Sequence, residues 1–401
     1  ETESPRGRIA LMKAVHEQRI SITPTVYRHW DLCVQCRACE IACPSGVPYG
    51  DLIETTMAYM EPQRKLSIYK KMLGKILLEQ LIPYQNRLGI LIKFLRIYQL
   101  TGIQWIIRRT KVLQLLSSNV SEIEKSYPTI SGNSLIASGQ EIPSIGKKRG
   151  RVALLTGCVM PLINGPQMRA TIRVLAHNGC TVELTAGQVC CGAINSHSGD
   201  LRTARKLAKR NIDVFQSGNL STLIVASAGC GARMKQYDEL LKDDPIYSQK
   251  ALSFSAMVKD IHEYLIEIGF RIPKSTIPLR VTYQDSCHLA NAQKITDAPR
   301  QILASIPGVE FVEMEDSMIC CGAGGAYSIT QREFSLRILR SKMKNVKNTN
   351  ADVVVTANPG CLLQLQNGIQ RSELTMQVKY ITDLLDEAYS AEESRKPNHS
   401  L

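Results

Sequence analysis

Thirteen cysteines stand in this 401-residue chain, and most of them fall into sets whose spacing suits metal binding. Two adjacent pairs of cysteines are each followed by glycine, and each pair has one further cysteine well upstream and one well downstream. Corresponding positions in the two sets lie 129 to 131 residues apart. Four thiols that recur in this way predict a metal or iron–sulfur site in each set. The first CCG set is Cys158, Cys190, Cys191 and Cys230, and the second CCG set is Cys287, Cys320, Cys321 and Cys361.

A third set, the ferredoxin-type run, precedes both CCG sets. It consists of Cys33, Cys36, Cys39 and Cys43 followed by Pro44, in the spacing C-x2-C-x2-C-x3-C-P. This spacing is typical of bacterial ferredoxins, whose thiolates hold [4Fe–4S] clusters. Zinc is the alternative, but zinc ribbons usually separate two CxxC pairs by a longer spacer. We therefore predict that this run binds a 4Fe-4S cluster.

The fourth cysteine of this run, Cys43, raises the question of which cluster it ligates. In two-cluster ferredoxins the fourth cysteine ligates the other cluster, so Cys43 would need three partner thiols from an earlier run. Residues 1–32 contain no cysteine. Either an earlier run precedes Glu1, or all four thiols serve one unusual cluster. We favour an N-terminal truncation, because residues 5–9 read as mid-domain sequence.

The segments around the CCG sets must place these thiols together, and their pattern is that of an α/β fold. Short apolar runs lead directly into Cys158, Cys230, Cys287 and Cys361, with helical patterns between them. Alternating strands and helices predict a mostly parallel sheet in each half, with its cysteines at the carboxyl ends of strands. The match between the halves indicates a duplication. We expect strands near 151–158, 181–184, 222–227, 280–287, 309–314 and 352–357, and helices near 170–176 and 201–217.

Residues 61–111 have a different character. They carry eleven Lys or Arg against two Glu, and apolar residues recur at helical spacing with breaks at Pro83 and Gly102. One interpretation is a basic amphipathic helix pair on an anionic membrane face or a partner. The other is a helical linker that packs on the next domain and leaves a solvated basic face. The sequence leaves both open, and residues 117–149 read as an irregular crossover.

Composition limits the classes of partner and compartment. The net charge is +13, but six Phe and two Trp are too few for an aromatic base-stacking surface, so we predict no nucleic-acid partner. Cysteines in a chain of this length favour metal or redox sites over disulfides. No run of about 18 apolar residues and no secretory leader is evident. We predict a cytoplasmic protein, with peripheral contact on the inner face of the membrane as an extension.

These residues resemble the iron–sulfur subunit of bacterial glycolate oxidase (glycolate dehydrogenase), within the cysteine-rich CCG-domain family. The resemblance spans essentially the whole chain and implies that a flavin-binding dehydrogenase subunit oxidises a 2-hydroxy acid. This chain would pass the electrons through 4Fe-4S clusters to a quinone-type acceptor, without flavin or NAD of its own and without catalytic residues. The residues that carry it are 7–9, 33–46, 188–193, 228–232 and 355–361.

The chain departs from the family pattern in two ways. Relatives typically place another ferredoxin run before the position of Glu1. The fuller CCG motif ends in CxxC, whereas Arg233 and Gln364 stand at the last position here. Heterodisulfide reductase, another member of the CCG-domain family, uses five thiols per cluster to split a disulfide, so four thiols favour electron relay.

Several alternatives to the glycolate enzyme remain. The lactate-utilisation iron–sulfur protein and the iron–sulfur subunit of anaerobic glycerol-3-phosphate dehydrogenase share the CCG motifs. Heterodisulfide-reductase-like thiol catalysis is a third alternative, and a zinc-stabilised binding module without redox function is a fourth. Iron and sulfide analysis separates zinc from the others.

The predicted architecture is an α-helical ferredoxin-like N-terminal segment followed by two duplicated α/β CCG cysteine-rich domains. His197 and His288 lie near cluster thiols in the sequence and could donate hydrogen bonds or carry protons, with simple packing as the alternative. Cys180 has no counterpart in the second half and reads as a small buried residue. The predicted segments are 1–58 (ferredoxin-type), 59–148 (basic helical linker), 149–272 and 273–390 (CCG domains), and 391–401 (disordered tail).

Overall fold

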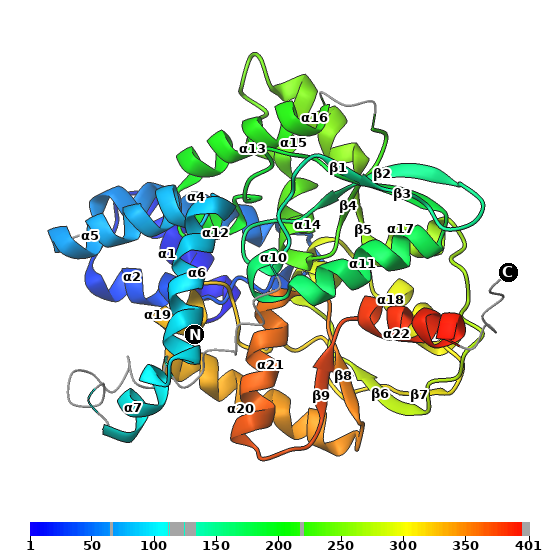
Figure 1. The fold of residues 1–401 in the computed structure, drawn as a ribbon. Helices are drawn as coiled ribbons and strands as arrows, with labels where there is room; N and C mark the ends of the chain where they lie inside the picture. The colour runs from blue at the N-terminus through cyan, green and yellow to red at the C-terminus, as the bar shows by residue number, and fades with distance from the viewer. Residues whose placement is uncertain (65–66, 111, 113–123, 125–133, 217–219, 395–401) are drawn as a thin grey trace, which may run out of the picture.

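The computed structural model contains an N-terminal helical unit, a helical linker and two α/β units (Figure 1). It describes residues 1–64, 67–110, 112, 124, 134–216 and 220–394. Each α/β unit is built on a largely or fully parallel sheet. The predicted fold class, a helical segment followed by two duplicated α/β units, is confirmed.

The helical unit packs around Trp30, which is almost fully buried with Val26 and Ile53. Two of its helices begin with a hydroxyl cap: Ser4 accepts from the Gly7 amide and Thr23 accepts from the Val26 amide. Proline follows each cap, where its missing amide costs no helical hydrogen bond. The elements are α1 (Pro5–His16), α2 (Pro24–Asp31), α3 (Ala38–Ile41), α4 (Tyr49–Met60) and the 3-10 turn η1 (Glu61–Gln63).

The linker forms helices with breaks at the two predicted positions. Pro83 lies between η2 and α6, and Gly102, with φ +78°, lies between α6 and α7. No single helix in the described ranges is long and apolar enough to cross a bilayer, although α6 and α7 together, bent by 69°, meet that length and composition. The elements are α5 (Ile68–Lys75), the π-helix η2 (Ile76–Leu81), α6 (Gln85–Leu100) and α7 (Ile103–Thr110).

The first α/β unit has a five-stranded sheet in the order β1-β3-β2-β4-β5. The strand β1 pairs antiparallel with β3, and the other neighbours are parallel. Residues 140–142 therefore belong to this sheet, although the predicted boundary put them in the linker. The elements are β1 (Gln140–Ile142), β2 (Gly150–Leu155), α10 (Met160–Ile163), α11 (Gly165–His177), β3 (Cys180–Leu184), α12 (Ala193–His197), α13 (Leu201–Gln216), β4 (Leu223–Val225), α14 (Ala228–Met234), α15 (Tyr237–Leu240), α16 (Ser248–Met257), β5 (Val258–Asp260) and α17 (Ile261–Glu267).

The second α/β unit repeats this plan with four parallel strands in the order β7-β6-β8-β9. Its β6 and β8 correspond to β2 and β4 of the first unit, since each leads into a cysteine of its CCG set. The elements are β6 (Leu279–Tyr283), the π-helix η3 (His288–Ala292), α18 (Asp297–Ser305), β7 (Val309–Val312), α19 (Tyr327–Thr330), α20 (Arg332–Asn348), β8 (Val353–Val355), α21 (Pro359–Arg371), β9 (Gln377–Lys379) and α22 (Ile381–Ser394).

The last helix of each α/β unit packs against a helix of the other unit, and we call α17 and α22 the exchanged helices. The helix α22 of the second unit packs on α11 of the first, and α17 of the first packs on α18 of the second (Figure 1). Arg173 on α11 forms a two-pronged ion pair with Asp386 on α22, at 2.8 and 2.6 Å. One apolar core therefore runs through both units, from Val152 and Leu154 to Val281 and Tyr389.

The helix α22 continues to Ser394, past the predicted start of a disordered tail at residue 391. Arg271 pairs with Glu392 at 2.7 Å, and Tyr389 is fully buried just before it. These long-range contacts hold the end of the helix, which a polar local composition does not reveal. The rest of the predicted tail, residues 395–401, lies outside the described residues.

The exchanged helices predict cooperative unfolding. Replacing the fully buried Leu385 of α22 by alanine leaves a cavity in the shared core, so Leu385→Ala should lower the free energy of unfolding by about 2–5 kcal/mol. Both sheets should unfold in one transition when unfolding in urea is monitored by circular dichroism. The variant and the unmodified protein are compared at equal iron content. The exposed Leu252→Ala on α16 should change the free energy by less than about 0.5 kcal/mol. Two separate transitions would contradict a shared core.

Candidate functional site

The three cysteine sets meet around one cavity of about 1300 Å³ between the helical unit and the two α/β units. Ten of the thirteen cysteines line it: two from the ferredoxin-type run, Cys33 and Cys36, and all eight from the CCG sets. Cys39 and Cys43 stand outside this lining. Thiols that are up to 328 residues apart in the sequence therefore share one site.

The parallel strands place the outer cysteines of each CCG set at the same edge of the sheet. In the first unit, Cys158 follows β2, and Cys230 lies in the first turn of α14, which follows β4. The Sγ atoms of Cys158 and Cys190 are 3.5 Å apart. The loop with Cys190 thus reaches the edge at which β2 and β4 end.

A glycine after each cysteine pair lets the loop turn back onto the following helix. Gly192 and Gly322 have φ of +81° and +86°, a region that favours glycine. A Cβ at Gly322 would lie 2.5 Å from the Ser335 carbonyl oxygen. The Gly192 amide also lies 3.5 Å from Cys190 Sγ, and the Gly322 amide 3.3 Å from Cys320 Sγ. Each amide donates to sulfur and thereby stabilises a thiolate.

Burial and mutual proximity disfavour free thiolates in the cavity. Burial, followed by the nearby Cys320, raises the pKa of Cys36 to about 12. Hydrogen bonds with neighbouring thiols, together with burial, also raise the pKa of Cys191 and Cys230. A bound metal cation reverses this preference, because a coordinating thiol is deprotonated outright. The donor set thus fits a positively charged, thiolate-binding group.

The number and type of the donors can be compared with known metal groups. Among the residues that the structure describes, no three His, Cys, Asp or Glu side chains are placed to hold a single metal ion. The twelve cysteines of the three sets match the all-thiolate chemistry of [4Fe–4S] clusters.

Within the ferredoxin-type run, Cys43 has different surroundings from the other three cysteines. Burial raises the pKa of Cys39, and Cys33 is the next cause. By contrast, backbone amides of Val47, Ser45 and Gly46 lower the pKa of Cys43. The prediction that Cys43 serves a different cluster from its neighbours stays a prediction.

The ferredoxin-type run rests on both α/β units. Asn291 Nδ2 donates to the Cys36 carbonyl oxygen at 2.8 Å, which joins the run to the second unit. Gln35 Nε2 donates to the His197 carbonyl oxygen at 2.9 Å, which joins it to the first. Gly324 faces Val34, and a Cβ there would lie 2.8 Å from Val34 Cγ2. These contacts bring Cys36 close to the second CCG set.

A buried ion pair fixes the helical unit on the first α/β unit. Arg233, at the position where the fuller motif has cysteine, pairs with Glu54 of α4, and each side chain is 7% exposed. His197 Nδ1 lies 2.9 Å from Glu54 Oε1, and Arg37 Nη2 lies 3.9 Å away. Although burial opposes them, contacts from His197 and Arg233 hold the pKa of Glu54 well below its usual range. Arg233 therefore anchors the helical unit.

The corresponding position in the second unit supports the cysteine pair instead. Gln364 Nε2 donates to Ser335 Oγ at 2.9 Å, and Ser335 Oγ donates to the Gly322 carbonyl oxygen at 2.7 Å. The two departures from the motif thus have different structural roles. Sequence analysis identified the positions but had no local pattern from which to infer these partners.

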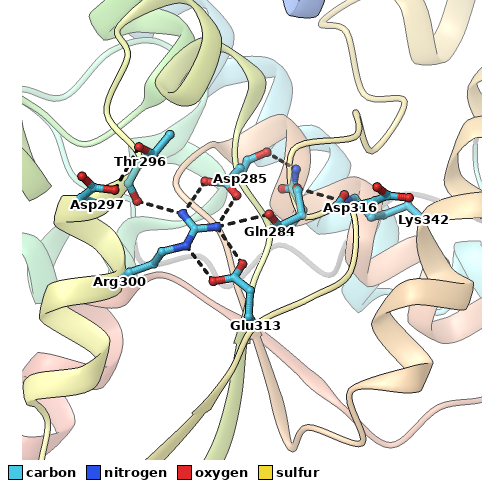
Figure 2. Close-up of polar contacts among 9 residues, drawn as sticks. Gln284, Asp285, Thr296, Asp297, Arg300, Glu313, Asp316 and Lys342 are labelled. Carbon is cyan, nitrogen blue, oxygen red and sulfur yellow. Dashed lines mark hydrogen bonds and ion pairs between the residues drawn. The ribbon is translucent and has the colours of Figure 1, made fainter.

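Figure 2 shows a second polar network that sequence analysis missed. Arg300 on α18 donates to both oxygens of Asp285, at 3.0 and 2.7 Å, and to both oxygens of Glu313, at 2.7 Å each. Asp285 stands two residues before Cys287, and Glu313 belongs to the segment that leads to Cys320. Arg300 therefore links the segment before Cys287 to the segment before Cys320.

The two predicted histidines both line the cavity, with ring centroids 5.2 Å apart. Burial lowers the pKa of His288 to about 3, so this ring is neutral at pH 7. A role in hydrogen bonding or proton transfer stays a prediction. Cys180 is fully buried on β3, where its Sγ lies 3.5 Å from the Tyr264 hydroxyl.

Three family models match four segments of the chain. A model described as "Cysteine-rich domain" matches residues 152–235 and 281–366. The model "Glycolate oxidase iron-sulfur subunit, linker region" matches residues 70–126, and "4Fe-4S binding domain" matches residues 26–49. These matches fall on both α/β units, the linker and the ferredoxin-type run.

Two relatives described as glycolate oxidase iron-sulfur subunits align with nearly the full chain. The chain is 41% identical to the "Probable glycolate oxidase iron-sulfur subunit" of Bacillus subtilis (strain 168), over 97% of this chain and 88% of the relative. It is 28% identical to the "Glycolate oxidase iron-sulfur subunit" of Escherichia coli (strain K12), over 98% and 89%. It is 32% identical to "Lactate utilization protein A" of Oceanobacillus iheyensis, over only 59% of this chain and 96% of the relative.

The buried pair predicts how the helical unit is attached. Glu54→Gln would leave Arg233 buried with no carboxylate opposite it, a change that costs about 3–5 kcal/mol for a buried pair. The helical unit should then become sensitive to proteases at concentrations that leave the α/β units intact. The control is Glu239→Gln, whose ion pair with Lys242 is more than half exposed and should contribute little. Equal protease resistance of Glu54→Gln and the unmodified protein would contradict the anchoring role.

Proposed function

The chain belongs to the family of glycolate oxidase iron–sulfur subunits, and we propose that it relays electrons from a flavin-binding dehydrogenase subunit to a quinone-type acceptor. Its place in that family makes it an oxidoreductase component that works in a complex with other subunits. Its cofactors are 4Fe-4S clusters. The observation that carries the relay is the single cavity lined by ten cysteines from all three sets.

We propose that the twelve cysteines of the three sets are the cluster ligands. Bound iron–sulfur clusters supply sites that accept and release single electrons. The chain's own residues bury the thiols and direct the amides of Gly192 and Gly322 at sulfur. The ligands are Cys33, Cys36, Cys39 and Cys43 in the run, Cys158, Cys190, Cys191 and Cys230 in the first CCG set, and Cys287, Cys320, Cys321 and Cys361 in the second.

Two observations favour relay in a glycolate enzyme over the alternatives. Arg233 pairs with Glu54 and Gln364 bonds to Ser335, so the positions of a fifth thiol serve packing in both units. This disfavours heterodisulfide-reductase-like catalysis. The match of residues 70–126 to the glycolate oxidase linker model favours that enzyme over the lactate-utilisation and glycerol-3-phosphate alternatives.

We also propose that the linker helices contact the inner, anionic face of the membrane from the cytoplasmic side. Along α6 and α7 the large apolar side chains Phe94, Leu100 and Trp105 are all more than 60% exposed. Lys93 and Arg96 lie among them and are exposed as well. Exposed apolar side chains beside basic ones suit the boundary between lipid headgroups and acyl chains.

The relay predicts which substrate reduces this subunit. In the complex with its flavin-binding partner, glycolate should elicit the electron paramagnetic resonance (EPR) signals of reduced clusters, whereas lactate and glycerol 3-phosphate should not. Cys191→Ser should lower glycolate-dependent quinone reduction by more than the ~100-fold typical of changes around metal ligands. Cys180→Ser is the matched control, because Cys180 is buried away from the cavity. Stoichiometric zinc without iron, or reduction by lactate alone, would contradict the proposal.

The membrane contact predicts charge-dependent binding to vesicles. The complex should co-sediment with vesicles that contain phosphatidylglycerol and not with pure phosphatidylcholine. Changing both Lys93 and Arg96 to Gln should weaken binding by about 2 kcal/mol, roughly 30-fold, at about 1 kcal/mol per basic residue. The control changes the exposed Lys344 and Lys347 of α20 to Gln. Equal loss in both double variants would show a non-specific charge effect and exclude this surface.

A further inference from the structure

The helix after each cysteine pair packs in the same register in both units. Gly192 faces Ala204 on α13, and Gly322 faces Ser335 on α20. Ala204 and Ser335 lie 131 residues apart, and so do Asn211 and Lys342. Asn211 and Lys342 therefore occupy equivalent positions, and both are fully buried.

In the first unit this position is a neutral amide that closes the loop of the cysteine pair. Asn211 Oδ1 accepts from the Val189 amide at 3.0 Å. Its Nδ2 donates to the Cys190 carbonyl oxygen at 3.1 Å and to the Tyr237 hydroxyl at 3.3 Å. The Asn211 side chain thus makes three hydrogen bonds at this position and carries no charge.

In the second unit the same position is a buried lysine. Lys342 Nζ donates to the carbonyl oxygens of Asp316 and Ser317, at 2.7 and 2.9 Å, and Figure 2 shows it beside Asp316. In the described part of the chain, no carboxylate lies within ion-pair distance of Nζ. The ammonium is therefore a buried cation whose hydrogen bonds go to carbonyl oxygens and not to a carboxylate.

Lys342 is bound to the segment that leads into the second CCG set, because Ser317, whose carbonyl oxygen accepts from Nζ, lies three residues before Cys320. Burial lowers the pKa of Lys342, and the nearby Cys321, Cys287 and Asp285 oppose that shift.

The other charges near the two sets are paired. In the second unit both carboxylate oxygens of Asp285 accept hydrogen bonds from Arg300, which also pairs with the half-exposed Glu313. In the first unit the buried Arg233 pairs directly with Glu54. Each of these pairs largely cancels its own field at a distance. Among the buried Lys and Arg side chains of the described residues, Lys342 alone has no carboxylate partner, and this distinguishes the two sets.

We propose that Lys342 raises the reduction potential of the cluster at the second CCG set above that of the cluster at the first. A reduced cluster is more negative than an oxidised one, and a nearby cation in a poorly screened interior stabilises the more negative form. Asn211, being neutral, gives the first set no such stabilisation. The inference rests on one part of the proposed function, namely that each CCG set holds a cluster that accepts one electron.

The test replaces Lys342 by the residue of the other unit. In the full-length protein, Lys342→Asn should lower the midpoint potential of one cluster in an EPR-monitored titration by 59 mV or more, a tenfold change for a one-electron couple. Lys342→Arg keeps the charge and should retain most of the potential. Lys347→Asn, an exposed lysine on the same helix, should leave every potential unchanged. Iron and sulfide content is measured for each variant.

Two results would overturn the inference. One is an iron-replete Lys342→Asn protein with unchanged potentials, and the other is an equal shift in all clusters, because the field of one buried charge is local. If the Lys342→Asn protein loses the second cluster, the test is made instead on the two CCG cluster potentials of the wild-type protein. Cys361→Ser removes the signal of the second set, and that signal must belong to the higher-potential of the two CCG clusters. A chemical reductant is used throughout, so failure here is distinct from failure of glycolate to reduce the complex.

Discussion

The structure depends on gathering buried thiols that would otherwise remain protonated. Burial and mutual proximity raise the pKa of most cysteines around the cavity, so these donors become thiolates only when positive charge is bound beside them. A cavity of about 1300 Å³ lined by ten such residues must be held open by its surroundings. The shared core, the exchanged helices and the buried pair between Arg233 and Glu54 meet that requirement.

Direct contacts between the two duplicated units explain why the units cannot be considered separately. Loops that carry Cys230 and Cys361 are joined directly, since the Ala228 amide donates to the Ala357 carbonyl oxygen at 3.0 Å. Asn358 Oδ1 also accepts from the Gly229 amide at 3.1 Å. A displacement of one unit would therefore move a cysteine of the other. The exchange of α17 and α22 makes such a displacement costly, because it would open the common core.

Local sequence patterns predicted the parts of the molecule that follow from local chemistry. The apolar runs before Cys158, Cys230, Cys287 and Cys361 are the strands β2, β4, β6 and β8, and their parallel order puts the thiols at one edge. The sequence did not reveal β1, whose three residues become a strand only through pairing with β3. It also did not reveal the extension of α22, which Arg271 stabilises from a distant segment. The partners of buried charges were beyond sequence analysis for the same reason, because Glu54 lies 179 residues from Arg233 and no periodic pattern brings them together.

The duplicated units show how one scaffold acquires two electrostatic environments. The register shared by α13 and α20 puts Asn211 and Lys342 at one position, so the difference between them is chemical and not geometric. The same holds for Arg233 and Gln364, where one residue anchors the helical unit and the other supports its own cysteine pair. A charge placed in a buried, equivalent position acts most strongly on the nearer set of thiols, because its field falls with distance and is little screened by solvent. Duplication followed by such single changes thus gives two sites on equivalent scaffolds with unequal affinity for an electron.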